Sequence, residues 1–264
     1  MPRFTISIFL LLLSSYSEAI VTRHDIDVNK HEVREKPPQY LIDMPGEGHA
    51  VLISEQWLLT VGHVIFRDYR GIDFDVSGVK NNISDVIFHP GFIKAPADFD
   101  YSNTDKLKAL LSTRSDLALI KLKYPVKHIK PISLYDKNDE QGKTVEIFGK
   151  GATGNGKTGM LFETKHQKKL RFCRNVITGV NNNWLSYEFD FGDAAIPLEG
   201  IHGSGDSGGA SIIYVNKMPF LAGLSSWQWQ GDKSEFSPML YGTIAYQVRI
   251  SSYTKWINLI TKGS

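Results

Sequence analysis

Three polar side chains, far apart in the sequence, could together activate a hydroxyl group for nucleophilic attack. Ser207 lies in the glycine-rich segment Gly205–Gly209. His63 ends an apolar run, and Asp116 opens another. A serine hydroxyl is a weak nucleophile at neutral pH, so it needs an imidazole to take its proton and a buried carboxylate to orient that imidazole. The order His63, Asp116, Ser207 predicts a catalytic triad if the fold brings the three side chains together.

Two other motifs compete for the chemistry. Gly205–Gly209 also fits G-x-S-x-G, the nucleophile elbow of α/β-hydrolases, but that fold needs a histidine after the serine and none follows Ser207. The segment 151–158 fits the P-loop pattern G-x-x-x-x-G-K-[ST], yet no helical pattern follows it where a nucleotide-binding unit requires one. A glycine-rich hairpin turn is the interpretation that the context favours.

The composition excludes several classes of protein. The 264 residues include 30 Lys+Arg and 28 Asp+Glu, and 42% are hydrophobic, as is ordinary for a soluble globular chain. This near-neutral balance gives no general attraction to nucleic acid, and we expect no nucleic-acid partner. Cys173 is the single cysteine, which excludes an intramolecular disulfide framework and a cysteine-based zinc cluster. We expect neither a metal nor a cofactor.

The first 19 residues have the pattern of a secretory signal peptide. Arg3 precedes a short apolar run, and Ser17 and Ala19 occupy the small-residue positions before a cleavage site. The run is about half as long as the roughly 20 residues that a membrane-spanning helix needs. We therefore expect a secreted protein, extracellular or periplasmic, that starts at Ile20 and has no membrane contact after cleavage. An uncleaved short anchor is the alternative.

Short β-type runs between turn residues predict an all-β protein. The expected strands are 50–53, 57–61, 85–89, 117–122, 144–148, 175–180, 184–189, 210–215 and 220–225. Helical spacing of apolar residues predicts two helices, Asn103–Leu111 and Ser251–Lys262, the second with Ser251 or Ser252 as its N-cap. The first of these helices falls in the segment 89–115, which we interpret as a surface insertion.

Several segments resemble the trypsin/chymotrypsin-like serine peptidases. Thr60-Val-Gly-His63 resembles the family's Thr-Ala-Ala-His, 116–122 resembles its Asp-Ile-Ala-Leu-Leu strand, and 205–209 matches its nucleophile loop. Ser226-Trp227 resembles its substrate-binding Ser-Trp strand, and 251–257 resembles its C-terminal helix. The similarity covers almost the whole chain after residue 19. Val64 stands where animal members carry a disulfide cysteine, so a disulfide-poor, bacterial-type member is expected.

The resemblance implies a peptidase domain over 20–264 that contains two six-stranded antiparallel β-barrels. Barrel one would cover 38–133, barrel two 142–250, and a C-terminal α-helix 251–262. Ser207 would attack the scissile carbonyl, His63 would act as general base and then acid, and Asp116 would orient His63. The backbone N–H groups of Gly205 and Ser207 would form the oxyanion hole.

The resemblance also implies a maturation step. In this family a new Ile-Val amino terminus inserts and pairs with the aspartate before the nucleophile, which here means that Ile20 pairs with Asp206. Because Ile20 follows the expected signal peptide directly, signal peptidase itself would create the activating terminus. The alternative is that Ile20 merely starts a surface strand.

Substrate specificity follows from residues near the nucleophile. Ile201, six residues before Ser207, falls where the family places the base of its primary pocket, and an uncharged side chain there argues against trypsin-type selection of Arg or Lys. The other expected substrate-binding residues are His202, Ser226, Trp227 and Gln228. With Gln228 at the pocket entrance, we expect a narrowed, partly polar pocket that takes a small or medium uncharged residue. His202 as an exposed loop residue is the alternative.

Together these features predict a secreted serine endopeptidase that acts on polypeptide substrates through an acyl-enzyme, as a monomer. The alternative is a catalytically silent binding protein that keeps the peptidase fold.

Overall fold

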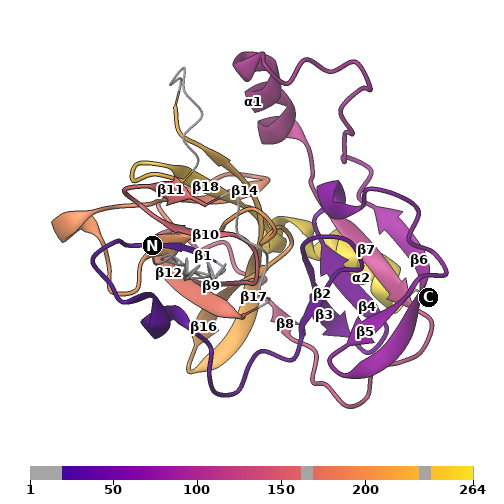
Figure 1. Cartoon of the computed structure of the whole chain (residues 1–264). Helices are drawn as coiled ribbons and strands as arrows, with labels where there is room; N and C mark the ends of the chain where they lie inside the picture. The colour runs from indigo at the N-terminus through magenta and orange to yellow at the C-terminus, as the bar shows by residue number, and fades with distance from the viewer. Residues whose placement is uncertain (1–19, 162–168, 232–238, 264) are drawn as a thin grey trace, which may run out of the picture.

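The computed structural model describes residues 20–161, 169–231 and 239–263. The expected signal peptide, 1–19, lies outside the described residues. Two β-rich bodies lie side by side, and a C-terminal helix crosses from one to the other (Figure 1). The expected all-β architecture with a C-terminal helix is confirmed.

The first body is a nearly closed antiparallel barrel of six strands. Their order in the sheet is β2-β3-β4-β7-β6-β5, and the end strands β2 and β5 lie against each other. The strands are β2 (Leu41–Asp43), β3 (His49–Ser54), β4 (Trp57–Thr60), β5 (Asp73–Val76), β6 (Val79–Phe88) and β7 (Ala118–Leu122). Apolar side chains that alternate along these strands fill the interior, among them Leu52, Leu58, Ile83 and Ile120.

The second body, called the second barrel below, is a half-barrel whose main sheet has eight strands among the described residues, where a six-stranded barrel was expected. The order is β12-β9-β16-β17-β18-β14-β13, and β8 pairs with β17 in parallel. The two additions, β8 and β13, have two residues each. The strands are β8 (Ser133–Leu134), β9 (Thr144–Gly149), β12 (Arg171–Val176), β13 (Gly179–Val180), β14 (Trp184–Glu188), β16 (Ala210–Val215), β17 (Met218–Trp229) and β18 (Ile244–Arg249).

A small sheet holds the start of the described chain against the second body. Its strands are β1 (Ile20–Thr22), β10 (Thr153–Asn155), β11 (Gly159–Met160) and β15 (Gly200–Ile201), in the order β11-β10-β1-β15. Because β10 and β11 form an antiparallel pair, the P-loop-like segment is a hairpin, as its context predicted. The two strands that flank β1 lead into the loops around the nucleophile candidate.

Several expected elements have different limits; β6, for example, already starts at Val79 and β17 at Met218. The expected strand 175–180 is wrong: β12 already starts at Arg171, and the chain turns after Val176 before the separate strand β13. Its start was hidden because Arg171, a charged residue, is fully buried and paired with Glu32. The last helix, α2 (Thr254–Lys262), follows a 3₁₀ turn, Ile250–Tyr253, so neither Ser251 nor Ser252 caps it.

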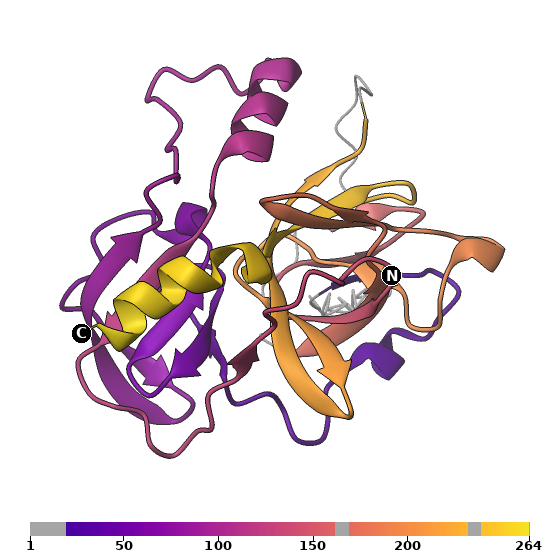
Figure 2. The ribbon, with the colours of Figure 1, turned by 180° about the vertical axis from the view of Figure 1, so that it is seen from behind.

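The inserted helix α1 (Thr104–Thr113) stands away from the barrels in both views (Figures 1 and 2). Asn103 caps its start by accepting a hydrogen bond from the backbone of Lys106 at 3.0 Å. Its far end is tied to the second body, because the indole Nε1 of Trp184 donates to the carbonyl of Ser112 at 2.8 Å. The insertion therefore bridges the two bodies on one side of the molecule.

One continuous apolar cluster fixes the two bodies relative to each other. It includes Val51 and Leu119 from the first barrel and Ile212 and Trp227 from the second, and α2 joins it through Ile257. Figure 2 shows α2 packed across the back of the first barrel. This shared core sets the relative positions of loops that come from different barrels.

Three further observations bear on the expectations. Cys173 is fully buried, and burial raises the pKa of its thiol well above the usual value, so the thiol stays protonated. In the described ranges, no group of three or more His, Cys, Asp or Glu side chains could hold a metal ion. No helix in the same ranges is long and apolar enough to cross a membrane.

The packing of α2 predicts an asymmetric response to mutation. Ile257 is 1% exposed and Leu259 is 76% exposed on the same helix. Ile257→Ala is expected to lower the free energy of unfolding by about 2–5 kcal/mol, because it leaves a cavity. Leu259→Ala is expected to change it by less than about 0.5 kcal/mol. Urea unfolding followed by tryptophan fluorescence measures both, and equal losses would contradict the docking of α2.

Candidate active site

The three triad candidates meet between the two barrels. His63 lies in a 3₁₀ turn after β4, Asp116 precedes β7, and Ser207 precedes β16. The Nε2 atom of His63 is 2.9 Å from the Ser207 hydroxyl, and its Nδ1 atom is 2.6 Å from an Asp116 carboxylate oxygen. Both distances are within hydrogen-bond reach, so one imidazole connects the hydroxyl to the carboxylate.

Asp116 is held by donors from three segments of the chain. The backbone N–H of His63 donates to one carboxylate oxygen at 2.9 Å, and the Ser226 hydroxyl donates to the other at 2.6 Å. Burial by itself raises the pKa of this carboxyl, but the charges of His63 and Arg114 and hydrogen bonds from His63 and Ser226 outweigh it. The pKa of Asp116 therefore lies well below its usual range, and the group stays ionised.

Arg114 is a neighbour of the triad that the sequence analysis missed. Its Nη2 atom donates to Asp116 at 3.1 Å, and the side chain is almost fully buried. The guanidinium also lies 5.8 Å from the ring centre of Phe92. The one signal in the sequence is its position two residues before Asp116. Its fixed positive charge favours the ionised form of Asp116.

Two backbone amides beside Ser207 are available to a ligand. Among the described residues, the N–H groups of Gly205 and Ser207 have no acceptor. Gly205 and Gly208 adopt φ angles of 85° and 76°, which glycine reaches without strain. The turn is closed because the N–H of Gly208 donates to the carbonyl of Ser225 at 2.8 Å. This arrangement suits the two amides to bind an anionic oxygen.

Asp206 occupies a buried site made of backbone groups. The N–H groups of Gly151 and Gly203 donate to its two carboxylate oxygens at 2.6 and 2.7 Å, and Ile20 donates through its backbone. Burial raises the pKa of Asp206. It outweighs these hydrogen bonds and the nearby His49, which lower that pKa. A side chain at Gly149 would collide with the carboxylate. Gly149 and Gly151, next to and at the start of the P-loop-like segment, thus help to hold the carboxylate of Asp206.

Ile20 lies inside the protein. It is fully buried in β1, between β10 and β15, so the surface-strand alternative does not apply. Its φ angle is 67°, a left-handed conformation that is unfavourable for a β-branched residue.

The expected specificity residues have different environments. Ile201 packs in the apolar core of the second barrel, and Trp227 stacks on Tyr246 with ring centres 3.8 Å apart. Ser226 is bound to Asp116, as described above. Gln228 is partly exposed, and its side-chain amide donates to the carbonyl of His202 at 2.8 Å.

His202 is not an exposed loop residue. Only 1% of it is exposed, and its Nδ1 atom lies 3.1 Å from the amide of Gln247 and 3.4 Å from the Tyr187 hydroxyl. Burial lowers the pKa of His202 to about 3, with a contribution from His63, so the ring is neutral at physiological pH. Sequence reasoning missed Tyr187 and Gln247, which no local motif marks.

Comparisons with known proteins give a family match and several relatives. Residues 27–257 match the family model described as Trypsin. The chain is 29% identical over 251 residues to the complement C1s subcomponent of Sus scrofa, and this match covers 84% of the chain. It is 27% identical over 253 residues to the calcium-dependent serine proteinase of Mesocricetus auratus, which covers 86% of it. The matches cover 33% of each relative, so the chain spans about a third of their length.

The contact between Arg114 and Asp116 predicts a pH-dependent loss of stability. Arg114→Gln is expected to lower the free energy of unfolding by about 1.5–3 kcal/mol at neutral pH, where the buried carboxylate is ionised. A carboxyl with a depressed folded-state pKa contributes stability above its unfolded pKa of about 3.9 and loses it as the pH falls. The unfolded-state pKa is common to both chains, so the difference from wild type narrows only as the pH falls through the folded-state pKa of Asp116, which Arg114 helps to lower.

Urea unfolding from pH 7 down to pH 2 measures this difference. Arg114→Lys is the control that keeps the positive charge and should lose less stability at neutral pH. A loss in Arg114→Gln that is the same at every pH would show that Arg114 contributes packing alone.

Proposed function

The chain belongs to the trypsin family, and we propose that it is a secreted serine endopeptidase that hydrolyses peptide bonds with Ser207, His63 and Asp116. The observation that carries the proposal is the unbroken set of contacts from the Ser207 hydroxyl through His63 to Asp116. Three residues far apart in sequence have the geometry that general-base activation of a serine requires.

Each step of the proposed reaction has a residue in position. His63 takes the proton of Ser207 while the serine oxygen attacks the carbonyl carbon of the substrate. The negative charge that develops on the carbonyl oxygen is stabilised by the N–H groups of Gly205 and Ser207, and one such donor is worth about 3–4 kcal/mol in well-studied cases. His63 then protonates the leaving amine, and an acyl group stays on Ser207. Water, deprotonated by His63, releases that acyl group.

We further propose that cleavage before Ile20 completes the active form. In the uncut chain Ile20 has a strained φ angle, which costs roughly 1–2 kcal/mol. Once the preceding peptide bond is broken this angle no longer exists, and the amide becomes an ammonium group. That ammonium would lie where the Ile20 N–H already meets Asp206. The ion pair would stabilise the ionised form of a buried carboxylate that burial disfavours.

The proposed specificity is for a small or medium uncharged residue before the cut. Ile201 and His202 supply no negative charge to select lysine or arginine, since Ile201 is apolar and His202 is neutral. The hydrogen bond from Gln228 to His202 supports a narrowed entrance to this pocket. The domain limits 20–264, the signal peptide over 1–19, the monomeric state and the disulfide-poor bacterial type belong to the same proposal.

The contact between Gln228 and His202 also favours a second candidate, a binding protein that keeps the fold. If the glutamine amide stays on the His202 carbonyl, it could keep a substrate side chain out of the pocket. Such a protein would retain the triad geometry and fail to turn over peptides.

Cleavage of a peptide library separates the two candidates. The chain that begins at Ile20 is expected to cut peptides, as mass spectrometry of the products would show. Ser207→Ala is expected to lower kcat by about 10⁵–10⁶-fold, because the nucleophile is lost. A wild-type chain that folds and cuts no library peptide would contradict the peptidase and favour the binding protein.

The maturation proposal predicts that the first residue controls activity. A chain that begins at Ala19 is expected to have kcat/KM lower by roughly 100-fold or more, because its ammonium group cannot pair with the buried Asp206. A chain that begins at Ile20 and carries Ile20→Val keeps the ammonium group and should stay active. Equal activity of the chains that begin at Ala19 and at Ile20 would contradict the maturation proposal.

A further inference from the structure

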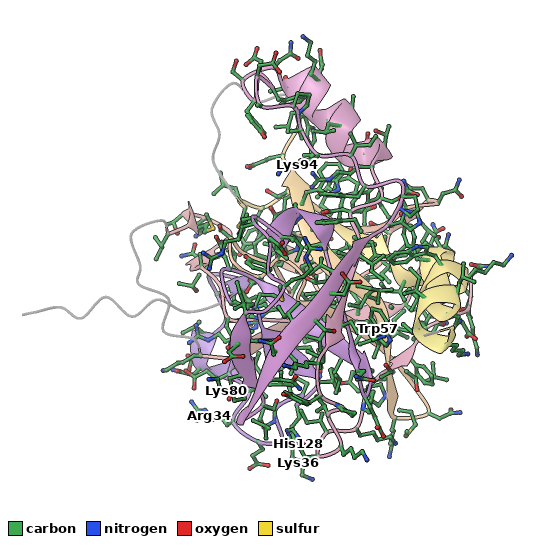
Figure 3. All side chains as sticks on the ribbon, turned by 90° about the vertical axis from the view of Figure 1, so that its right-hand side faces the viewer. Arg34, Lys36, Trp57, Lys80, Lys94 and His128 are labelled. Atoms are coloured by element: carbon green, nitrogen blue, oxygen red, sulfur yellow. The ribbon has the colours of Figure 1, made fainter. Side chains whose placement is uncertain are left out.

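A hollow of about 830 Å³ opens beside His63 on the first barrel. The segments 65–70 and 86–101 form its walls, and Arg114 closes its inner end. Figure 3 places Lys94 of the second wall below α1. We infer that this hollow selects polypeptide substrates that carry Asp or Glu next to an aromatic or large aliphatic residue near the cut. This inference rests on the proposed peptidase function.

The floor and rim of the hollow are apolar. Ile65, Val86 and Phe92 are half-buried in it, and Phe88 stacks on Phe92 with ring centres 5.2 Å apart. On the rim, Phe66 is 57% exposed and Tyr101 is 63% exposed. Single exposed aromatic residues are common on protein surfaces, but several around one concave site are typical of a surface that binds an apolar group.

The charges of the hollow are unbalanced. Four of its lining residues are cationic, and Asp68 is the one acidic residue in its lining. Asp68 is bound to Arg70, and Arg114 is bound to Asp116. Arg67 and Lys94 are exposed, and within the described residues neither forms an ion pair. Two positive charges are therefore left for a ligand, and the guanidinium of Arg67 lies 5.8 Å from the ring centre of Tyr69.

Two other positions around the site, within the described residues, offer no free cation. The residue expected at the base of the primary pocket, Ile201, is apolar. On the other side of the nucleophile a smaller hollow contains Lys150, but this cation is paired with Asp43 at 3.0 Å. Arg67 and Lys94 therefore complement a carboxylate at the hollow, and the apolar residues of its floor complement the neighbouring substrate residue.

The hollow also has a fixed outer wall. The insertion that carries Lys94 continues into α1, whose end is held by the second barrel through Trp184. Lys108 of α1 lies 5.0 Å from the ring centre of Trp229 in β17. At its start, the N–H of His89 donates to the carbonyl of Leu117 at 2.9 Å, so the insertion is anchored at both ends, which lowers the entropic cost of binding.

Matched peptides test the inference. Sequences that the wild-type chain cuts in a library are resynthesised with Glu or with Gln at each of the four positions on either side of the cut. At low ionic strength, Glu is expected to raise kcat/KM over Gln by roughly 3- to 10-fold at the position that reaches the hollow, the effect of one or two exposed ion pairs. This preference should fall with added salt.

Variants test whether the hollow causes the preference for Glu over Gln. The double variant Arg67→Gln, Lys94→Gln is expected to bring the Glu/Gln ratio close to one. Lys255→Gln, which removes an exposed cation of α2, should leave the ratio and the activity unchanged.

The possible results distinguish a failure of this inference from a failure of the proposed function. Active wild-type protein with a Glu/Gln ratio of one at every position would overturn the inference and leave the peptidase in place. A ratio that survives in the double variant would also overturn it. Absence of any cleavage would contradict the peptidase itself, and the inference with it.

Discussion

The buried carboxylate of Asp116 is the interaction on which the rest of the site depends. An ionised group with no exposure is stable only when donors surround it, and here they come from His63, Arg114 and Ser226. His63 and Arg114 belong to the first barrel and Ser226 to the second, so the carboxylate is satisfied only when the barrels are docked. The shared apolar core between the barrels supplies that docking. Arg114 adds a fixed positive charge that favours the ionised form of this carboxylate.

A second buried carboxylate, Asp206, connects the active site to the start of the chain. Its donors are backbone N–H groups, and among the described residues no cation forms an ion pair with it. The same loop carries the two free amides beside Ser207, so the state of Asp206 and the shape of the oxyanion site are linked by covalent geometry. An ammonium group at Ile20 would supply the missing charge next to a site that is already formed.

The meeting of the three triad candidates was predictable because each stands in a local motif, and their order along the chain excludes the nucleophile elbow of α/β-hydrolases. The C-terminal helix was predictable from apolar periodicity, and about half of the strands in the described ranges from short β-type runs, but β18 and most of the short strands were not. Charged or polar residues in the interior were not: Arg171 is buried beside Glu32, and His202 is buried beside Gln247. From the local sequence such residues are expected at the surface, because only long-range contacts bury them. For the same reason the start of β12 and the role of Arg114 became visible only in the structure.

Reaction with a fluorophosphonate, which forms a stable covalent bond with an activated serine, tests the central claim most directly. The account predicts that the chain beginning at Ile20 gains one adduct, that peptide mapping places it on Ser207, and that Ser207→Ala and His63→Ala each abolish it. Their folding is checked by circular dichroism. A folded wild-type chain that remains unlabelled, or is labelled equally well without His63, would contradict the proposal that the imidazole activates the hydroxyl.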